Sequence, residues 1–365
     1  MSNSAMPATI QDAPGLRRFA MALCLATLLL IFFGGQVKSH EAGLAVPDWP
    51  LTYGENPVTF GISKWTGGIF HEHFHRLFAG AVALMTVTLA IGLYIKEQRV
   101  WLVALGAGAV LLVLFQALLG GLTVWYQLPV LVSSAHAILA QTFFLVTLVI
   151  WYGLSREQAR RREGLINGTV ESGTPLKTGA LVLIAAIYLQ LFLGAIMRHT
   201  ESGLAVYDFP TTAGQILPLV GEETLANINN WRFENTDSLG AILPDVTREQ
   251  VFIHLGHRGG AVLVTAIVAA LAFVAYRRRE SHPALWRTAL WLSATVAIQI
   301  LLGAMTIWTV KQPYVTSVHV VTGAAVLGLA TLLALRAWPL AAYEADSASD
   351  GTPASARTGL KTATS

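Results

Sequence analysis

Acidic and basic residues are absent from one long stretch of this chain. No Asp, Glu, Lys or Arg occurs from Val100 to Ser155, a stretch of apolar and small residues. A helix that crosses a bilayer needs about 20 apolar residues, so a single helix of this length would extend far beyond any membrane. The stretch therefore predicts two membrane spans with a break near Tyr126 to Pro129. A soluble protein with a large core would not contain it.

Apolar stretches of span length recur along the whole chain. The sequence is 54% hydrophobic and only 12% charged, whereas soluble domains contain about 25% charged residues. We therefore predict an all-α integral membrane protein with eight transmembrane helices. The expected spans lie near residues 18–37, 75–95, 101–125, 132–154, 178–197, 255–276, 286–310 and 315–337.

The distribution of Lys and Arg predicts the orientation of these spans. One side holds Arg17, Arg18, Lys96, Arg99, the arginine runs 160–162 and 277–279, and Arg336. The other side holds segments 38–70 and 198–250, in which Asp and Glu outnumber Lys and Arg. Because Lys and Arg are enriched in cytoplasmic loops, we expect a multi-pass protein of the cell (inner) membrane with both termini cytoplasmic. The arginine runs are then topology determinants, and no nucleic-acid partner is expected.

Three segments of the first half of the chain recur in the second half. Residues 37–50 (VKSHEAGLAVPDWP) match 197–210 (MRHTESGLAVYDFP), and residues 72–82 match 254–264. Residues 116–136 (QALLGGLTVWYQLPVLVSSAH) also match 299–319 (QILLGAMTIWTVKQPYVTSVH). The repeat predicts two pseudo-symmetric four-helix bundles in the same orientation, an arrangement known among membrane folds.

The repeat and the composition together predict the domain organisation. The first four-helix half spans residues 17–155, and the second spans 178–341. A cytoplasmic linker at 156–177 joins them. The small and polar ends, 1–16 and 342–365, are predicted to be disordered.

Four histidines occupy equivalent positions near the outer ends of the second and fourth spans of each half: His75, His136, His257 and His319. Two facing imidazoles in a four-helix bundle can supply both axial ligands of a heme iron. Ionisable groups within spans are costly and usually functional, which favours this interpretation over four structural histidines. Zinc is a weaker candidate, because each half offers only two imidazoles and Cys24 is the sole cysteine.

Small residues near these histidines would let a flat macrocycle approach the backbone, although glycine is also common at transmembrane helix contacts. They are Gly80, Gly120, Gly121, Gly259, Gly260, Gly303 and Gly323. Further histidines are interpreted as interfacial residues at the margins of the outer loops: His40, His71, His73 and His199.

An arginine follows one candidate ligand in each half: Arg76 follows His75, and Arg258 follows His257. A guanidinium group fits a heme propionate well, and the duplication favours that role over contact with lipid headgroups. Lys38 has a basic counterpart, Arg198, at the equivalent position of the second half. These two residues could pair with propionates or hold the outer loops in place.

Taken together, these motifs resemble the heme A synthase family. They are Glu72-x-x-His75-Arg76, the GLAVPDWP loop, LLGGLTVW followed by Ser-x-His136, and Gly-His-Arg followed by Ser-Val-His319. The resemblance covers the chain from about residue 17 to 340. In one respect the chain departs from the family: many members carry a cysteine pair where Val46 and Thr52 stand here, so a loop disulfide is not expected.

The resemblance implies an enzyme that oxidises heme O to heme A, by converting a ring methyl to a formyl group through successive hydroxylations. It further implies that His75 and His136, with Arg76, bind the substrate heme. His257 and His319 would hold a resident heme b that relays electrons, with Arg258 at its propionates.

The expected partners follow from this activity. They are heme O, the lipid bilayer and an electron donor that the sequence does not identify. Heme O synthase and a second copy of the chain are considered as further partners.

One difference between the halves points to a catalytic residue. Glu72 lies three residues before His75, about one helical turn, whereas His254 occupies the equivalent position before His257. A carboxylate beside a heme can orient a substrate hydroxyl and move protons, so Glu72 is predicted to be catalytic. The alternative is a structural salt bridge between Glu72 and Arg76.

Two other classes of protein use parts of the same pattern. A di-heme cytochrome would use the four histidines to transfer electrons without modifying heme. A transporter or heme-export subunit would use the repeat, but the spans contain little of the mid-helix Pro expected of gating helices. The carboxylate present in one half only favours the synthase over the cytochrome.

Overall fold

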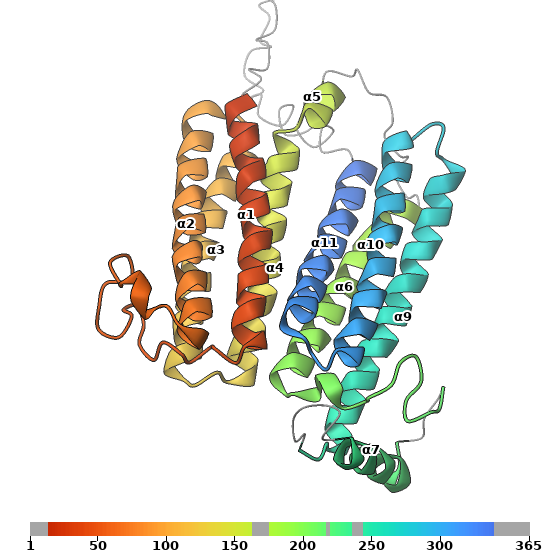
Figure 1. Cartoon of the computed structure of the whole chain (residues 1–365). Helices are drawn as coiled ribbons and strands as arrows, with labels where there is room; N and C mark the ends of the chain where they lie inside the picture. Colours follow the sequence, from red (N-terminus) through yellow and green to blue (C-terminus); the bar gives the residue numbers. More distant parts are fainter. Residues whose placement is uncertain (1–13, 163–174, 217–219, 236–243, 339–365) are drawn as a thin grey trace, which may run out of the picture.

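The computed structural model describes residues 14–162, 175–216, 220–235 and 244–338 (Figure 1). Within these residues, eight helices are long and apolar enough to cross a membrane, which confirms the predicted number of spans. They are α1 (Pro14–Ser39), α2 (Gly67–Lys96), α3 (Val100–Trp125), α4 (Val130–Gly153), α6 (Pro175–His199), α9 (Arg248–Arg277), α10 (Pro283–Trp308) and α11 (Pro313–Ala337). Two shorter helices are α5 (Arg156–Arg162) and α7 (Glu222–Glu234). The predicted disorder of the two ends falls almost entirely outside the described residues, as does most of the linker.

The break predicted within the uncharged stretch lies where the sequence places it. Helix α3 ends at Trp125, and Gln127 and Leu128 adopt left-handed backbone conformations with φ of 57° and 60°. Pro129 then precedes the first residue of α4, where its missing N–H costs no hydrogen bond. The residues of this turn therefore end one helix and start the next within a few positions.

Two spans begin earlier than hydropathy predicts. Helix α2 starts at Gly67 rather than near residue 75, and α9 starts at Arg248 rather than near 255. The first turns of both helices contain polar side chains that pack against the outer loops, so the helices continue beyond their apolar segments. At α9 the start is fixed by a capping box between Thr247 and Gln250.

The helices form two groups with the same order of contacts. Helices α1, α2, α3 and α4 pack in a closed ring, and α6, α9, α10 and α11 form a second ring in the same order. The two rings meet where α1 packs on α11 and α4 packs on α6 and α11 (Figure 1). The first helix of each half thus contacts the last helix of the other.

Each ring has an apolar core of its own, and a third apolar cluster lies between the rings. Leu89 and Leu102 belong to the core of the first half, and Leu183 and Leu292 to that of the second. In the cluster between the halves, a Cβ built on Gly328 of α11 would lie 2.9 Å from the ring of Phe144 on α4. Close packing therefore holds the halves together along the depth of the membrane.

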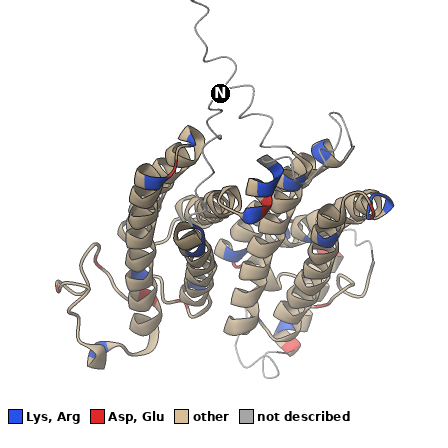
Figure 2. Ribbon diagram, turned by 90° about the horizontal axis from the view of Figure 1, so that it is seen from above, with Lys and Arg blue, Asp and Glu red and all other residues tan. Residues whose placement is uncertain are grey.

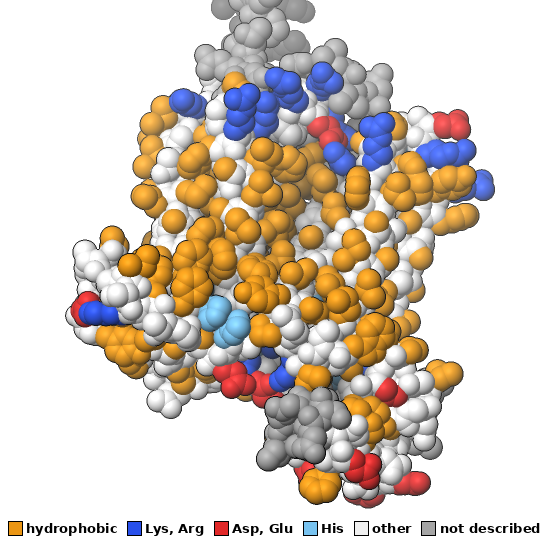
Figure 3. All heavy atoms as spheres, viewed as in Figure 1, with side chains coloured by type: hydrophobic (Ala, Val, Ile, Leu, Met, Phe, Trp, Pro, Cys, Tyr) orange, Lys and Arg blue, Asp and Glu red, His pale blue; other side chains and the backbone are white. Residues whose placement is uncertain are grey.

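The surface of the molecule is banded. Apolar side chains cover the middle of the helical bundle, while Lys and Arg gather at the end that carries α5 (Figure 3). Figure 2, viewed from that end, shows Lys and Arg at the ends of several helices and on α5. Exposed apolar side chains such as Leu84 and Leu111 are expected of helices whose outer faces contact lipid.

At the opposite end, ionic and polar contacts join the two halves. The carboxylate of Glu201, after α6, accepts hydrogen bonds from Lys38 of α1 and from Lys311 between α10 and α11. Arg198 of α6 donates to the Gly35 carbonyl at 2.7 Å and to the Ser39 hydroxyl at 2.6 Å. The basic residues at 38 and 198 therefore connect the halves rather than only the loops.

Replacing Glu201 should weaken this connection in a pH-dependent way. Burial raises the pKa of Glu201, but hydrogen bonds from Lys311 and Lys38 outweigh it and hold the pKa below its ordinary value. A carboxyl group with a lowered pKa stabilises the folded state above its unfolded pKa, about 4.3 for Glu, and this contribution is lost as the pH falls through the folded pKa. The thermal midpoint of Glu201→Gln should therefore lie below that of wild type near neutral pH, and the difference should vanish under acid conditions.

The matched control is Glu222→Gln, which removes an exposed ion pair with Arg248 within the second half. It should change the midpoint less than Glu201→Gln at neutral pH. A Glu201→Gln difference that is the same at neutral and acid pH would contradict the assignment.

Candidate functional site

The four predicted ligand histidines lie on α2, α4, α9 and α11, and each packs against a glycine of a neighbouring helix. A Cβ built on that glycine would lie 3.0 to 3.3 Å from the imidazole in every case. The pairs are Gly34 with His75, Gly120 with His136, Gly194 with His257, and Gly303 with His319. Only a residue without a side chain lets an imidazole lie this close to the next helix.

Two of these four glycines were missed by the sequence analysis. Gly120 and Gly303 were included among the small residues near the histidines, but Gly34 and Gly194 were not. The signal was present, because Gly34 and Gly194 are 160 positions apart, the same offset that relates Gly43 to Gly203 in the duplicated loop.

Each predicted pair of histidines lies within one ring of helices. His75 of α2 and His136 of α4 belong to the first ring, and His257 of α9 and His319 of α11 belong to the second. The Nδ1 atoms of His75, His136 and His319 are buried without a hydrogen-bond partner among the described residues. Buried polar atoms are rarely left unpaired in proteins. Paired imidazoles with unsatisfied ring nitrogens fit the axial ligation of a heme iron.

Glutamines also contact the histidines, and the sequence analysis did not identify them. Gln116 of α3 donates to the His136 carbonyl at 2.8 Å, and the equivalent Gln299 of α10 lies 3.5 Å from Nε2 of His319. These two contacts follow the repeat. They orient the fourth helix of each half against the third.

One glutamine contact exists in the second half alone. The side-chain amide nitrogen of Gln190 donates to the His257 carbonyl at 2.9 Å and lies 3.1 Å from His257 Nδ1. The equivalent position in the first half is Leu30, which can form no hydrogen bond. The environment of His257 is therefore more polar than that of His75 on this side.

Glu72 is buried, with 4% of its surface exposed, and both its oxygens accept hydrogen bonds. The Val46 backbone N–H donates to Oε2 at 2.8 Å, and the Arg76 guanidinium donates to Oε1. The salt bridge considered as the alternative role of Glu72 is thus present. At the equivalent position, His254 Nδ1 lies 3.0 Å from the Ser202 carbonyl, so each half uses this position to attach its second helix to its own outer loop.

The two arginines hold the outer loops. Arg76 donates to the carbonyls of Val46 and Asp48 at 2.9 and 2.6 Å. Arg258 donates to the carbonyls of Asp208 and Thr211, the latter at 2.8 Å. Much of the hydrogen-bonding capacity of both guanidinium groups is therefore used by the loops, and their pairing with heme propionates stays a prediction.

An aspartate stabilises each duplicated loop from within. Asp48 accepts hydrogen bonds from the backbone N–H groups of Tyr53 and Gly54, both at 2.7 Å. Asp208 accepts the same pair of bonds from Ala213 and Gly214, both at 2.9 Å. Burial raises the pKa of each carboxyl, but the hydrogen bonds outweigh it and lower the pKa. Both aspartates thus stay charged and hold the loops in one conformation.

Each loop carries an aromatic side chain that packs on the end of the third helix. Trp49 meets Trp125 of α3 with ring centroids 5.3 Å apart, and Phe209 meets Trp308 of α10 at 6.3 Å. A Cβ built on Gly121 would lie 2.6 Å from the Trp49 ring. Gly121 is therefore occupied by a loop contact.

The prediction that His71 and His73 lie in a loop margin was wrong. Both are within α2, and His73 is fully buried, with Nδ1 3.2 Å from the Thr52 hydroxyl. His71 stacks on His40 with ring centroids 3.9 Å apart and an angle of 10° between the rings. The span predicted from hydropathy began near residue 75, whereas the helix begins at Gly67. The prediction therefore left both residues outside the helix.

The fold and the paired histidines define a multi-pass membrane protein with two related polar sites within its helical bundles. The comparison with known families identifies which one: the chain belongs to the COX15-CtaA family of cytochrome oxidase assembly proteins, which matches residues 60–333. The family resemblance inferred from the motifs is confirmed.

Curated relatives carry the name heme A synthase and match most of this chain. The protein of Rickettsia bellii is 26% identical over 326 residues, which cover 80% of this chain and 89% of the relative. That of Halalkalibacterium halodurans is 26% identical, covering 83% and 91%, and that of Anaplasma marginale is 27% identical, covering 82% and 87%. The similarity therefore extends over both halves.

Filling one glycine should displace one histidine. In Gly194→Val, the new side chain would overlap the His257 imidazole, which lies 3.0 Å from the position of a Cβ. Overpacking of this kind costs about 1–3 kcal/mol, and the imidazole should move away from a ligand position. Purified protein should then contain less heme, measured by its absorbance per polypeptide.

Gly108→Val of α3 is the control, because no atom lies within 4 Å of its Cβ position and it is 12 residues from Gly120, the glycine that contacts His136. It should keep the heme content of the wild type. Equal heme loss in both variants would indicate that helix packing in general, rather than the position of His257, controls heme binding.

Proposed function

We propose that this chain is a heme A synthase, which oxidises a ring methyl of heme O to the formyl group of heme A. The observation that carries the proposal is a duplicated histidine pair combined with a carboxylate, Glu72, in one half alone. A protein that only transferred electrons would have no use for that difference between its halves. The names of the relatives support the same activity.

The two halves have different roles in this proposal. His75 and His136 bind heme O as substrate in the first half, and His257 and His319 hold heme b as a resident cofactor in the second. The Gln190 amide beside His257 supports the second assignment, since polar contacts to an axial ligand help to fix its orientation. The iron of each bound heme supplies the electron-transfer and oxidation chemistry of the reaction.

Glu72 acts on the substrate from the position next to His75. Its two hydrogen bonds, from Val46 and Arg76, hold the carboxylate in one orientation. Each oxygen keeps a second lone pair. With it, the carboxylate can accept a hydrogen bond from the hydroxyl group of a hydroxylated substrate methyl, or take up the proton of that hydroxyl. Because Glu72 and His75 are one helical turn apart, both side chains project from the same face of α2.

The banded surface supports the predicted orientation. Lys and Arg lie at one end of the bundle (Figure 3), the end at which α1 begins and α11 ends (Figure 1), so the positive-inside rule assigns both termini to the cytoplasm. The histidine pairs then lie toward the outer surface of the inner membrane. An electron donor would have to reach the heme of the second half at this depth.

The experiment that tests the activity is complementation. A bacterial strain that makes heme O but lacks its own heme A synthase should regain heme A when it expresses this chain, as measured by pigment extraction and chromatography. Heme O without any heme A, from a chain that still binds heme b, would overturn the proposal in favour of a di-heme cytochrome.

Glu72→Gln should separate catalysis from folding. The amide keeps the size of the side chain but cannot take up a proton at neutral pH, so heme A production should fall by on the order of 100-fold. Heme O or a partly oxidised intermediate should accumulate while the heme b content stays near wild type, although loss of the ion pair with Arg76 should lower the thermal midpoint.

His254→Gln is the control at the equivalent position of the second half, and it should retain heme A production. Full heme A production by Glu72→Gln would remove the catalytic role. Loss of heme b in that variant would reduce Glu72 to its salt bridge with Arg76.

Arg258→Lys tests the propionate prediction. A lysine ammonium cannot copy a bidentate guanidinium contact, so heme b should be retained less well through purification. The corresponding change at Arg76 should leave heme b in place and weaken binding of heme O alone. Unchanged heme b occupancy in Arg258→Ala would limit this arginine to its contacts with Asp208 and Thr211.

A further inference from the structure

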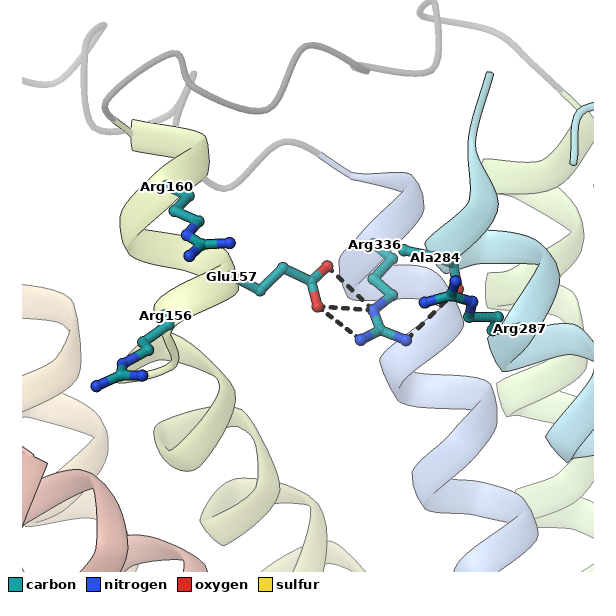
Figure 4. Close-up of a pocket in the computed structure, with 6 residues that line it drawn as sticks. All are labelled: Arg156, Glu157, Arg160, Ala284, Arg287 and Arg336. Carbon is teal, nitrogen blue, oxygen red and sulfur yellow. Dashed lines mark hydrogen bonds and ion pairs between the residues drawn. The ribbon is translucent and has the colours of Figure 1, made fainter. Parts of the chain in front are cut away.

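A cavity of about 340 Å³ opens at the end of the molecule opposite the histidine-bearing helix ends. It is lined by residues of α5, α10 and α11: Arg156, Glu157, Arg160, Ala284, Arg287 and Arg336 (Figure 4). Its volume is within the range of ligand pockets and far above that of a single water. Four guanidinium groups and one carboxylate give it an excess of positive charge.

The carboxylate in this cavity is already fully engaged. Arg336 donates to both oxygens of Glu157, at 2.6 to 3.1 Å, and Arg161 and the Tyr152 hydroxyl also donate to Oε1. Arg336 is further fixed by the Thr288 hydroxyl. Glu157 therefore offsets the charge of Arg336 and leaves little negative charge for the other arginines.

Two of the lining arginines are available to a ligand. Arg160 and Arg287 are exposed and form no ion pair or hydrogen bond with any residue in the part of the chain that the structure describes. They extend from α5 and α10 on opposite sides of the Glu157–Arg336 pair (Figure 4). An anion between them would be held from both sides.

The position of the cavity indicates where the anion comes from. Trp291 lies one turn along α10 from Arg287 and is 67% exposed, and its neighbour Leu290 is 52% exposed. Tryptophan is enriched at the level of lipid headgroups, and the exposed surface of α10 beyond it is apolar (Figure 3). A lipid whose headgroup lies in the cavity thus places its acyl chains beside the apolar surface of α10. A soluble anion has no acyl chains and gains nothing from that surface.

We propose that this cavity binds the phosphate of an anionic phospholipid, with Arg160 and Arg287 as its principal contacts. Guanidinium groups bind phosphate through paired, charge-assisted hydrogen bonds, and basic pockets between helices at the cytoplasmic face bind such headgroups. Arg160 follows the last helix of the first half, while Arg287 and Arg336 belong to the second. The bound lipid therefore connects the two halves at the end of the molecule opposite the Glu201 contacts.

The test uses the full-length, heme-loaded protein in a neutral detergent. Its thermal midpoint is measured during titration with phosphatidylglycerol, with phosphatidylcholine, and with inorganic phosphate at constant ionic strength. We expect phosphatidylglycerol to raise the midpoint at low concentration and the other two to have little effect. In Arg160→Gln/Arg287→Gln, the half-saturating concentration of phosphatidylglycerol should rise by about tenfold or more.

The matched control is Arg277→Gln/Arg278→Gln, which removes the same charge near the same end of the molecule but outside the cavity. It should respond to phosphatidylglycerol like the wild type. An equal loss of response in both double variants would overturn the proposal, since it would indicate general attraction to an anionic surface. Inorganic phosphate acting as strongly as the lipid would also overturn it, in favour of a soluble anion.

A last comparison guards against loss of folding. The heme content of each variant is measured first, and where the double variant does not retain it, Arg160→Gln alone is titrated. The single variant should still need a several-fold higher lipid concentration. A wild-type response in a correctly loaded single variant would contradict the assignment of Arg160.

Discussion

The close contact between imidazole and backbone constrains this structure more than any other interaction. Each of the four histidines packs on a glycine of the preceding membrane-spanning helix, 3.0 to 3.3 Å from where a Cβ would be, which is closer than ordinary van der Waals contact. The contact sets the spacing between the first and second helices of each half, and between the third and fourth. Because all four contacts obey the sequence repeat, the same spacing occurs twice. The four helices of each half form a closed ring. The ring and the helix spacing together place two imidazoles within each half.

The outer loops depend on the same helices in a second way. Each second helix extends beyond its apolar segment, so that Glu72 and Arg76, or His254 and Arg258, can hydrogen bond to the loop that precedes it. Leaving these polar groups unpaired near the membrane would cost several kcal/mol each. The loop therefore supplies hydrogen-bond partners for the polar side chains of the helix. In turn, the helix holds the loop over the outer ends of the histidine-bearing helices.

The sequence was sufficient to predict the number of spans, and it pointed to equivalent histidines in the two halves, because hydropathy and repeats are additive or periodic properties. Hydropathy sums along the chain, and equivalent residues such as His136 and His319 recur in the same order in both halves. The helix starts at Gly67 and Arg248 were not predictable in this way, since the stabilising contacts come from loops distant in sequence. For the same reason His73 was misplaced, and Gln190, which faces His257 from another helix, was missed.

The differences between the halves carry more functional information than the similarities. The shared elements, four glycine-supported histidines and two arginine-held loops, build two sites of one kind. Glu72 stands where the second half has His254, the stacked His40 and His71 have no counterpart, and Gln190 replaces Leu30. Glu72, His40 and His71 lie at or next to the outer ends of α1 and α2, and Gln190 contacts His257. A duplicated scaffold preserves the helix spacing in both halves, and in the proposed function this lets one half act on a substrate while the other keeps a resident cofactor in place.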